Sequence, residues 1–399
     1  MTLIRFYPVL SGKFTVWMVL MLALSAAISS PCASPAGAWT FTWSDEFNGA
    51  AVDAAVWGFE NGYVRNNEAQ YYSNRSENSR IEDGKLLIRA LKDNWSGHEY
   101  TSASRITRGK KSWRYGRFEI RAKIDIRSGS WPAWWWKGDN AGWPKGGEID
   151  MMEYYQNKCL FNVMDGNKGW TSPTRSITSL GGPRWAEEYH TWTMEWDSTR
   201  IDLSLDGVLI NHYEVDKANG TGPGGSNPLR QPGFMILNQA LGGNQGGDHT
   251  KTAYPVDFRV DWIREHTWDP NAQAVQVTVQ EGSGSGPYAQ GTKASLAANM
   301  PPLGQVFARW EVVAGTAVID DPGSPSALVT VPQAPVTVKA TYRPQGSHVL
   351  FHNKPGLLIG EAFSQGMFFN VLGRRLTGTA PLAPQIRILP LETPVPSSP

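Results

Sequence analysis

Apolar and polar residues alternate along the chain from about Trp39 to Trp268. In the clearest run, one face carries Phe118, Ile120, Ala122, Ile124 and Ile126, and the other carries Arg117, Glu119, Arg121, Lys123 and Asp125. A period of two residues is typical of a β-strand with one buried and one solvated face. No long stretch keeps the 3.6-residue period of a helix. The pattern therefore predicts a half-buried strand in this run and an all-β fold for the region.

Two dipeptides mark tight turns between the expected strands. Asp83-Gly84 and Asp206-Gly207 each stand between apolar runs, and glycine supplies the positive φ that a two-residue hairpin turn needs. Many antiparallel strands at short spacing predict a sandwich of two sheets, one of which can be concave and bind an extended ligand.

The N-terminal segment 1–38 is expected to be a signal peptide. Arg5 and Lys13 precede an apolar run over residues 14–28, and Ala36-Gly37-Ala38 forms a small-residue cleavage site. The run is short for a membrane span, and no other segment approaches the roughly 20 apolar residues that a spanning helix needs. We therefore expect a protein that is secreted or held at the cell surface, with no membrane span.

The chain has two cysteines. Cys32 leaves lipidation open, although Ser29-Ser30-Pro31 lacks the small residue expected beside a lipidated cysteine. Cleavage after Ala38 would leave only Cys159, so we expect no internal disulfide in the mature protein.

The rest of the sequence divides into four parts: a large β domain over 39–267, a linker over 268–274, a smaller β domain over 275–343 and a C-terminal tail over 344–399 of unknown role. The linker contains Asp269, Pro270 and Asn271, and a new set of short apolar runs follows it. The residues from Tyr288 to Asn299, with Phe307, Trp310 and the closing run Val336-Thr337-Val338-Lys339-Ala340-Thr341-Tyr342, give this second set its character. It resembles the small β-repeat domains, including internalin-type B-repeats, that are appended to bacterial surface proteins.

The overall charge limits the partners of the protein. Lysine and arginine number 37, aspartate and glutamate number 36, and the formal net charge is +1. No broad basic surface is expected to neutralise a phosphate backbone, which argues against a nucleic-acid partner. The chain has 18 tryptophans, and aromatic rings can stack on the flat apolar faces of sugars as well as fill a core. We expect a polysaccharide partner and a monomer.

Three acids stand close together in the segment Gly146-Gly147-Glu148-Ile149-Asp150-Met151-Met152-Glu153. Glu148 and Asp150 share one face of a strand, whereas Glu153 would fall on the opposite face of a regular strand. A β-bulge at Met151-Met152 would return Glu153 to the face of the other two. The spacing leaves open both the ~5–5.5 Å carboxyl separation of a retaining glycosidase and the ~6.5–9.5 Å separation of an inverting one. We prefer the retaining scheme, in which Glu148 is the nucleophile, Glu153 is the acid and base, and Asp150 tunes both. Such chemistry needs no metal or other cofactor.

The segment that surrounds these acids resembles glycoside hydrolase family sixteen, especially its bulged branch of laminarinases and agarases. The resemblance extends from about Phe41 to His266. The motifs that carry it, besides the acids, are Trp43-Ser44-Asp45-Glu46-Phe47, Asn66-Asn67-Glu68-Ala69-Gln70-Tyr71-Tyr72, Tyr115-Gly116-Arg117-Phe118-Glu119, Trp131-Pro132-Ala133, Ile236-Leu237-Asn238 and Leu241-Gly242-Gly243. It implies a concanavalin-like β-jelly-roll with a long cleft, retaining chemistry and cleavage inside the polysaccharide chain.

The same resemblance implies further site residues. Matching positions make Asn67, Trp131, Trp135 and Trp143 candidates for binding substrate in the cleft. They also make Glu46, Gly84 and Asp261 candidates for a structural Ca²⁺ site, since carboxylate and backbone oxygens suit that cation. One departure concerns the strand after the acids, over residues 160–165, where many members of the bulged branch place a histidine and this chain has none.

Three functions stay open at this stage. The first is a laminarinase-like hydrolase of β-1,3-glucan or mixed β-1,3-1,4-glucan. The second keeps the mechanism but cleaves a galactan, as agarases and porphyranases do. The third is a lectin-like protein that binds polysaccharide without cleaving it, although binding alone does not require two glutamates and an aspartate on one face.

Overall fold

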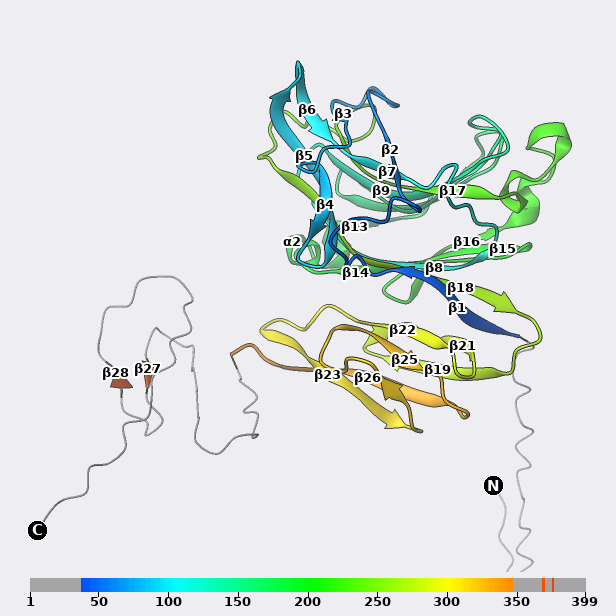
Figure 1. Cartoon of the computed structure of the whole chain (residues 1–399), viewed down its shortest axis with the longest axis vertical. Coiled ribbons are helices and arrows are strands. Elements are labelled where there is room, and N and C mark those ends of the chain that lie inside the picture. Colours follow the sequence, from blue (N-terminus) through cyan, green and yellow to red (C-terminus); the bar gives the residue numbers. More distant parts are fainter. Residues whose placement is uncertain (1–36, 347–367, 370–374, 377–399) are drawn as a thin grey trace, which may run out of the picture. The chain divides into compact units, whose positions relative to one another are not determined.

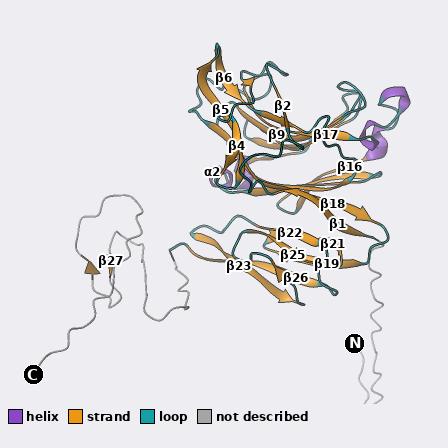
Figure 2. Cartoon of the chain, in the orientation of Figure 1, coloured by secondary structure: helices purple, strands orange, loops and turns teal. Residues whose placement is uncertain are grey.

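A computed structural model describes residues 37–346 and two short strands beyond them, β27 (Phe368–Phe369) and β28 (Arg375–Leu376). Residues 1–36, which include Cys32, and the rest of the tail after residue 346 lie outside the described residues. Strands dominate the described part of the chain (Figure 2). Within it, no helix is long and apolar enough to cross a membrane.

Two curved sheets face each other in the large domain (Figure 1). The first sheet has eight strands, with β13 (Thr174–Ser176) paired to β11; the others follow the order β12 (Trp170–Thr171), β11 (Lys158–Met164), β10 (Glu148–Tyr155), β9 (Ser130–Gly138), β17 (Gly233–Leu241), β7 (Ser104–Ile106) and β2 (Gly58–Glu60). The second sheet runs through β16 (Val208–Glu214), β15 (Arg200–Leu205), β14 (His190–Trp196), β8 (Gly116–Ile124), β18 (Val256–Asp269) and β1 (Ala38–Asp45). Four strands attach to it beside β18, namely β5 (Lys85–Trp95), β4 (Ser79–Glu82), β6 (His98–Ser102) and β3 (Tyr71–Tyr72).

The helices of the described residues are short. They are α1 (Ile177–Leu180), α2 (Pro183–Ala186), η1 (Val215–Ala218), η2 (Pro223–Gly225) and η3 (Pro228–Arg230). Both predicted hairpin turns are confirmed, because Asp83 and Gly84 have φ values of 54° and 67°, and Asp206 and Gly207 have values of 48° and 78°. The all-β sandwich predicted from the alternating pattern is therefore confirmed.

The core of the large domain lies between its two sheets. Apolar side chains from β8, β9 and β10 form one buried cluster, which includes Phe118, Ile120, Trp134, Trp136 and Met152. Cys159 is buried and free.

The charged face of β8 departs from the sequence prediction. Arg117, Glu119 and Arg121 are buried, with exposed fractions of 5%, 0% and 8%. Arg117 donates to Glu119 at 2.8 Å and to Glu195 at 2.7 Å. The prediction of a solvated face is wrong because opposite charges pair across this sheet and the smaller domain covers part of it: Arg117 also donates to the Ser285 carbonyl at 3.3 Å.

The smaller domain extends the second sheet. Its strands β21 (Gly286–Ala289), β19 (Ala274–Gln280), β26 (Val336–Pro344) and β23 (Gln305–Ala314) follow β1 in the same sheet, and β20 (Gly282–Ser283), β22 (Lys293–Ala298), β25 (Ser326–Thr330) and β24 (Val318–Ile319) form a separate four-stranded sheet. Trp39 of β1 lies opposite Tyr288 of β21 in a parallel pair and belongs to the apolar core of the smaller domain. Only residues 270–273 separate β18 from β19.

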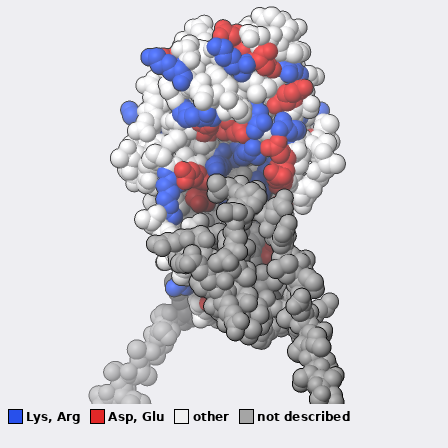
Figure 3. Space-filling view, turned by 90° about the vertical axis from the view of Figure 1, so that its left-hand side faces the viewer, with Lys and Arg blue, Asp and Glu red and all other residues white. Residues whose placement is uncertain are grey.

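Charges of both signs are mixed on the face of the molecule shown in Figure 3, where Lys and Arg alternate with Asp and Glu. This distribution agrees with the formal net charge of +1.

Candidate active site

The three acids lie on β10, which is kinked by a bulge. Between Asp150 and Glu153 this strand takes three steps, whereas each neighbour takes two: Leu160 to Asn162 on β11, and Ala133 to Trp135 on β9. Two residues therefore oppose one, which is the definition of a β-bulge. Met151 and Met152 absorb the extra step with side chains that are 1% and 0% exposed in the core. The predicted bulge is confirmed, and it turns Glu153 to the face of Glu148 and Asp150.

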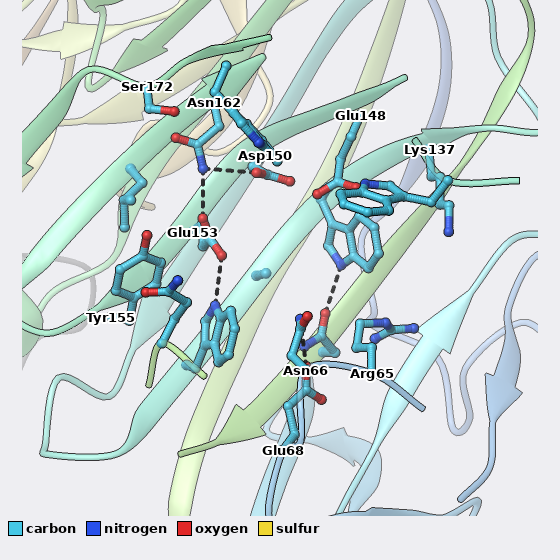
Figure 4. A pocket seen from close by; sticks show the side chains of 18 residues that line it. Arg65, Asn66, Glu68, Lys137, Glu148, Asp150, Glu153, Tyr155, Asn162 and Ser172 are labelled. Carbon is cyan, nitrogen blue, oxygen red and sulfur yellow. Dashed lines mark hydrogen bonds between the residues drawn. The ribbon is translucent and has the colours of Figure 1, made fainter. Parts of the chain in front are cut away.

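All three acids line a cavity of about 550 Å³. Its floor comes from β9, β10, β11 and β17, and one wall is the segment 65–68 (Figure 4). Besides the acids, the lining residues are Arg65, Asn66, Glu68, Trp131, Ala133, Trp135, Lys137, Trp143, Tyr155, Leu160, Asn162, Trp170, Ser172, Asn238 and Gln245. Aromatic rings with a few polar groups are the usual lining of a carbohydrate or small-molecule site.

Hydrogen bonds hold Glu153 in place from two sides. Trp131 Nε1 donates to its Oε1 at 2.7 Å, and Asn162 Nδ2 donates to its Oε2 at 2.7 Å. The same Asn162 Nδ2 also donates to Asp150 Oδ2 at 2.9 Å. Figure 4 shows this bridge between the two acids. Glu153 is thus fixed in orientation before any substrate arrives.

Burial raises the pKa of every acid in the cluster, because a low-dielectric site disfavours the charged form. Burial, and then the charge of Asp150, raises the pKa of Glu153 to about 8. Burial, and then the charge of Glu153, raises the pKa of Glu148 to about 7, while Lys137 opposes this shift. Burial and the charge of Glu148 raise the pKa of Asp150 well above its usual range. At neutral pH the cluster therefore retains protons, and Glu153 is suited to donate one.

A second hydrogen-bond chain supports the aromatic floor. Trp135 Nε1 donates to Asn238 Oδ1 at 2.8 Å, Asn238 Nδ2 donates to the Tyr72 hydroxyl at 3.0 Å, and that hydroxyl donates to Glu68 at 3.0 Å. The guanidinium of Arg65 lies 5.0 Å from the centre of the Trp135 ring. These contacts fix the plane of Trp135 on the cavity floor.

The structure places three of the four predicted substrate-binding residues in the cavity. Trp131 and Trp135 are 6% and 7% exposed, so little of each side chain is open to the cavity, whereas Trp143 is 46% exposed. Asn67 is not among the residues that line the cavity. Asn66 and Asn67 both have positive φ, so the chain turns there; Asn67 is exposed and donates to Asn244 at 3.0 Å, while Asn66 lines the cavity.

Sequence reasoning missed several lining residues. Lys137 could have been predicted from the alternation of β9, since it is two residues from Trp135 and therefore lies on the same face of the strand. The sequence also pointed to the strand of Asn162, because many members of the bulged branch place a histidine there. Arg65 and Trp170 come from segments without a regular period, and no pattern in the sequence points to them.

The predicted calcium residues do not form a site. Arg264 donates to both carboxylate oxygens of Glu46 at 2.9 Å. Asp261 pairs with Arg121 and, at 3.3 Å, with Lys85. Gly84 belongs to the adjacent hairpin turn. Basic side chains already neutralise both carboxylates, and the described residues contain no group of three or more His, Cys, Asp or Glu that could hold a metal. The residues therefore do not fit Ca²⁺.

Two family models match the chain. Residues 65–285, more than half of the 399, match the model for glycosyl hydrolases family 16. Residues 273–346 match a model for a divergent InlB B-repeat domain.

Individual relatives agree with the first match. A glucan endo-1,3-beta-glucosidase of Cryptopygus antarcticus is 32% identical over 264 residues, which cover 60% of this chain and 96% of that protein. The clotting factor G alpha subunit of Tachypleus tridentatus is 35% identical over 260 residues, but these are 36% of its length, so this chain spans about a third of that protein. Among solved structures, the laminarinase of Rhodothermus marinus aligns with a TM-score of 0.52 at 32% identity, over 58% of this chain and 99% of that one.

Proposed function

Because the chain belongs to glycosyl hydrolase family 16, we propose that it is a retaining endo-hydrolase of β-1,3-glucan, or of mixed β-1,3-1,4-glucan. The observation that carries this proposal is the bulge in β10, which gives Glu148 and Glu153 a common face in one aromatic cavity. The relatives named as a glucan endo-1,3-beta-glucosidase and a laminarinase support glucan as the polymer.

In the proposed mechanism Glu148 attacks the anomeric carbon and Glu153 protonates the leaving oxygen. The partner strand takes four steps between the residues opposite these acids, Lys137 and Ala133. At about 3.3 Å per step, the two backbones stand roughly 13 Å apart. Two glutamate side chains that lean inward can then approach the ~5–5.5 Å separation of a retaining pair.

In the second step Glu153 acts as the base and activates the water that releases the product. Its role changes because Glu153 became a carboxylate when it gave its proton to the leaving group. Asp150 lies between the two glutamates: its charge raises the pKa of Glu153 and so opposes ionisation of the acid, and its hydrogen bond with Glu148 holds the nucleophile in orientation.

Cleavage inside the chain is supported by the aromatic rim of the cavity. Trp143 and Trp170 are 46% and 44% exposed, and both line it. Exposed rings at the rim can stack on sugars that continue beyond the cleavage point, which suits a polymer better than a chain end.

The substrate proposal is tested by incubating the protein with laminarin, lichenan, agarose and porphyran and measuring new reducing ends. We expect laminarin to yield a mixture of intermediate oligosaccharides early in the reaction, with the β-anomer formed first by NMR. Glu148→Gln is nearly isosteric and should lower kcat by about 10⁴-fold or more while the protein stays folded. Full activity of this variant would remove the assignment of the nucleophile.

The other outcomes decide between the remaining alternatives. Products from agarose or porphyran alone would replace the glucanase with a galactan hydrolase. Binding to a polymer without products from any of the four would indicate a lectin-like protein.

We also propose that the protein is exported, on the basis of the basic start, apolar run and small-residue site within residues 1–38. Sequencing the N-terminus of protein recovered from the medium should give Trp39 as the first residue. A lipid on Cys32 in the membrane fraction would contradict this cleavage site.

A further inference from the structure

Four aromatic rings outside the cavity form an exposed group that the proposed mechanism does not use. Its members are Tyr63, Tyr71, Trp95 and His98, which we call the aromatic platform. The Tyr71 and His98 rings are stacked, with centroids 3.9 Å apart and planes at 17°. Tyr63 meets both rings edge-on, at 5.6 Å and 5.5 Å, and its hydroxyl lies 3.2 Å from His98 Nδ1. The tilted Trp95 ring lies 6.3 Å from Tyr71.

The outer parts of these rings face solvent. Tyr63 is 60% exposed and Trp95 is 39% exposed. Trp95 stands at the turn between β5 and β6, and Arg75 lies 4.8 Å from its ring centre while donating to Asp93 at 2.7 Å. Large rings that stay exposed add little hydrophobic stability to a fold, so an exposed cluster that is held rigid points to a binding surface.

The platform is continuous with the wall of the cavity. Gly62 and Tyr72 exchange backbone hydrogen bonds of 2.9 Å and 3.0 Å, which close residues 62–72 into a loop. Arg65, Asn66 and Glu68 of this loop line the cavity. Tyr63 is two residues before Arg65, so their Cα atoms are at most about 7 Å apart. A polymer that leaves the cavity past Arg65 therefore reaches Tyr63 within a short distance.

We propose that the aromatic platform is a secondary polysaccharide-binding site that holds the glucan chain outside the cavity. Sugar rings carry apolar C–H faces that stack on aromatic rings, and the Tyr63 hydroxyl and the His98 imidazole can hydrogen-bond sugar hydroxyls. Because the rings already pack against one another, binding orders few further side chains. The proposal rests on the proposed function, since its ligand is the same polymer as the substrate.

The test compares ligands of two lengths in the inactive Glu148→Gln background. Dissociation constants are measured by calorimetry for a β-1,3-linked trisaccharide, which occupies only the cavity, and for chains of ten or more sugars. We expect Tyr63→Ala with Trp95→Ala to raise the Kd for the long chain by about tenfold, because stacking contacts are lost. The Kd for the trisaccharide should change less than about twofold. Trp95→Ala alone changes a residue at an exposed turn and should raise the Kd for the long chain by part of that amount. This single variant keeps the proposal testable if the double variant misfolds.

A matched control is Trp268→Ala, since Trp268 is 40% exposed but lies at the end of β18. It should leave both Kd values unchanged. An unchanged Kd for the long chain in the double variant would overturn the platform proposal. An equal loss of affinity for the long chain and the trisaccharide would overturn it as well. So would a wild-type dimer that the double variant abolishes, because the rings would then form a protein interface.

The two proposals fail in different ways. If the wild type cleaves laminarin while the double variant binds long chains normally, the glucanase proposal is supported and the platform proposal is overturned. If the wild type cleaves only a galactan, the glucanase proposal falls, and the same comparison with long and short galactans decides the platform. If no polysaccharide is bound or cleaved, both fall.

Discussion

The amide of Asn162 contacts two of the three acids. Its Nδ2 donates to Asp150 at 2.9 Å and to Glu153 at 2.7 Å, and it is 4% exposed. An amide does not titrate between pH 4 and 10, whereas an imidazole does. Asn162 therefore holds the acids in position without taking one of their protons, and we assign it a positioning role.

Asn162→Leu should change both the rate and the pH profile. The hydrogen bond from Asn162 favours the charged form of Glu153 and lowers its pKa against the larger effect of burial. Its loss should raise that pKa further, so the alkaline limb of kcat/KM should move to higher pH by about half a unit or more. We expect kcat to fall by about 10–100-fold because Glu153 loses its fixed orientation.

Asn162→His is the matched variant, since a ring N–H can still donate to one acid. It should recover part of the activity lost in Asn162→Leu. A slower Asn162→Leu enzyme with an unmoved alkaline limb would indicate a merely structural role for this amide.

Glu153→Gln should make stability less dependent on pH. An unfolded glutamate ionises near its ordinary pKa of 4.5, whereas burial keeps folded Glu153 protonated up to about 8. Between these values the folded state binds more protons, so the wild type loses stability as pH rises, by up to ~1.4 kcal/mol per pH unit. The glutamine amide of Glu153→Gln does not ionise, so this loss of stability with rising pH is absent from the variant.

Urea unfolding at pH 4, 6 and 8 measures the effect. The stability difference between Glu153→Gln and wild type should shift in favour of the variant as pH rises. A difference that is constant across the three pH values would contradict the raised pKa.

Some residues of the candidate site could be predicted from the sequence, and others could not. The common face of Glu148, Asp150 and Glu153 can be predicted because parity along a strand is a strict constraint. The sequence does not reveal that Asn66 lines the cavity, because Asn66 and Asn67 both adopt positive φ in an irregular turn, where no period distinguishes one side of the chain from the other. The calcium prediction fails because the sequence does not reveal the ion pairs: Glu46 is 218 positions from Arg264, and Asp261 is 140 positions from Arg121.

The role of the bulge in β10 can be tested by deleting one residue. Without Met152, Asp150 and Glu153 would be two steps apart, as their partners on β9 and β11 already are. The strand would then pair regularly and keep all three acids on one face. We expect measurable glucanase activity, with stability lowered by about 2–5 kcal/mol because a buried methionine is lost.

Deletion of Val163 provides the control. This residue lies in a regular part of β11, opposite Ile149, so its loss would turn one end of the strand over and expose core side chains. It should abolish folding, as measured by circular dichroism. If the Met152 deletion folds but is inactive, the kink itself, rather than the common face, is what catalysis needs.

The face of β8 shows why the pattern of one strand is insufficient for an element. Alternation correctly placed Phe118 and Ile120 in the core. It could not reveal that Arg117 and Glu119 are also buried, because their cover comes from Glu195 of a neighbouring strand and from the smaller domain. Charged residues can be buried where opposite charges pair and hydrogen-bond.

The boundary between the two domains is a packed interface. Phe41 N donates to Thr292 at 2.9 Å, and Arg264 donates to the Ala327 carbonyl at 3.2 Å. Composition predicts the second domain and its strands, but not this interface, since its contacts join residues 251 and 63 positions apart with no repeated pattern.

A chain truncated after Asp269 should therefore fold less stably. Removing the smaller domain exposes Trp39, which is 5% exposed in the full chain, and the buried Arg117, Glu119 and His266. We expect Tm to fall by about 5 °C or more. The kcat for short oligosaccharides should change less than about twofold, because the cavity lies on the eight-stranded sheet.

Acid should narrow the difference in stability between the full and truncated chains. Burial lowers the pKa of His266 to about 4; Arg117 and Arg264 contribute to this shift, and Glu119 opposes it. Between pH 6.5 and 4, His266 is protonated in the unfolded chain but stays neutral in the folded chain. The full chain therefore loses stability as pH falls. In the truncated chain the imidazole is exposed and its pKa returns toward 6.5, which removes this loss. Thermal unfolding of both chains at pH 7.5 and 4.5 measures the difference, and a gap in Tm that widens at pH 4.5 would show that the smaller domain does not hold His266 neutral.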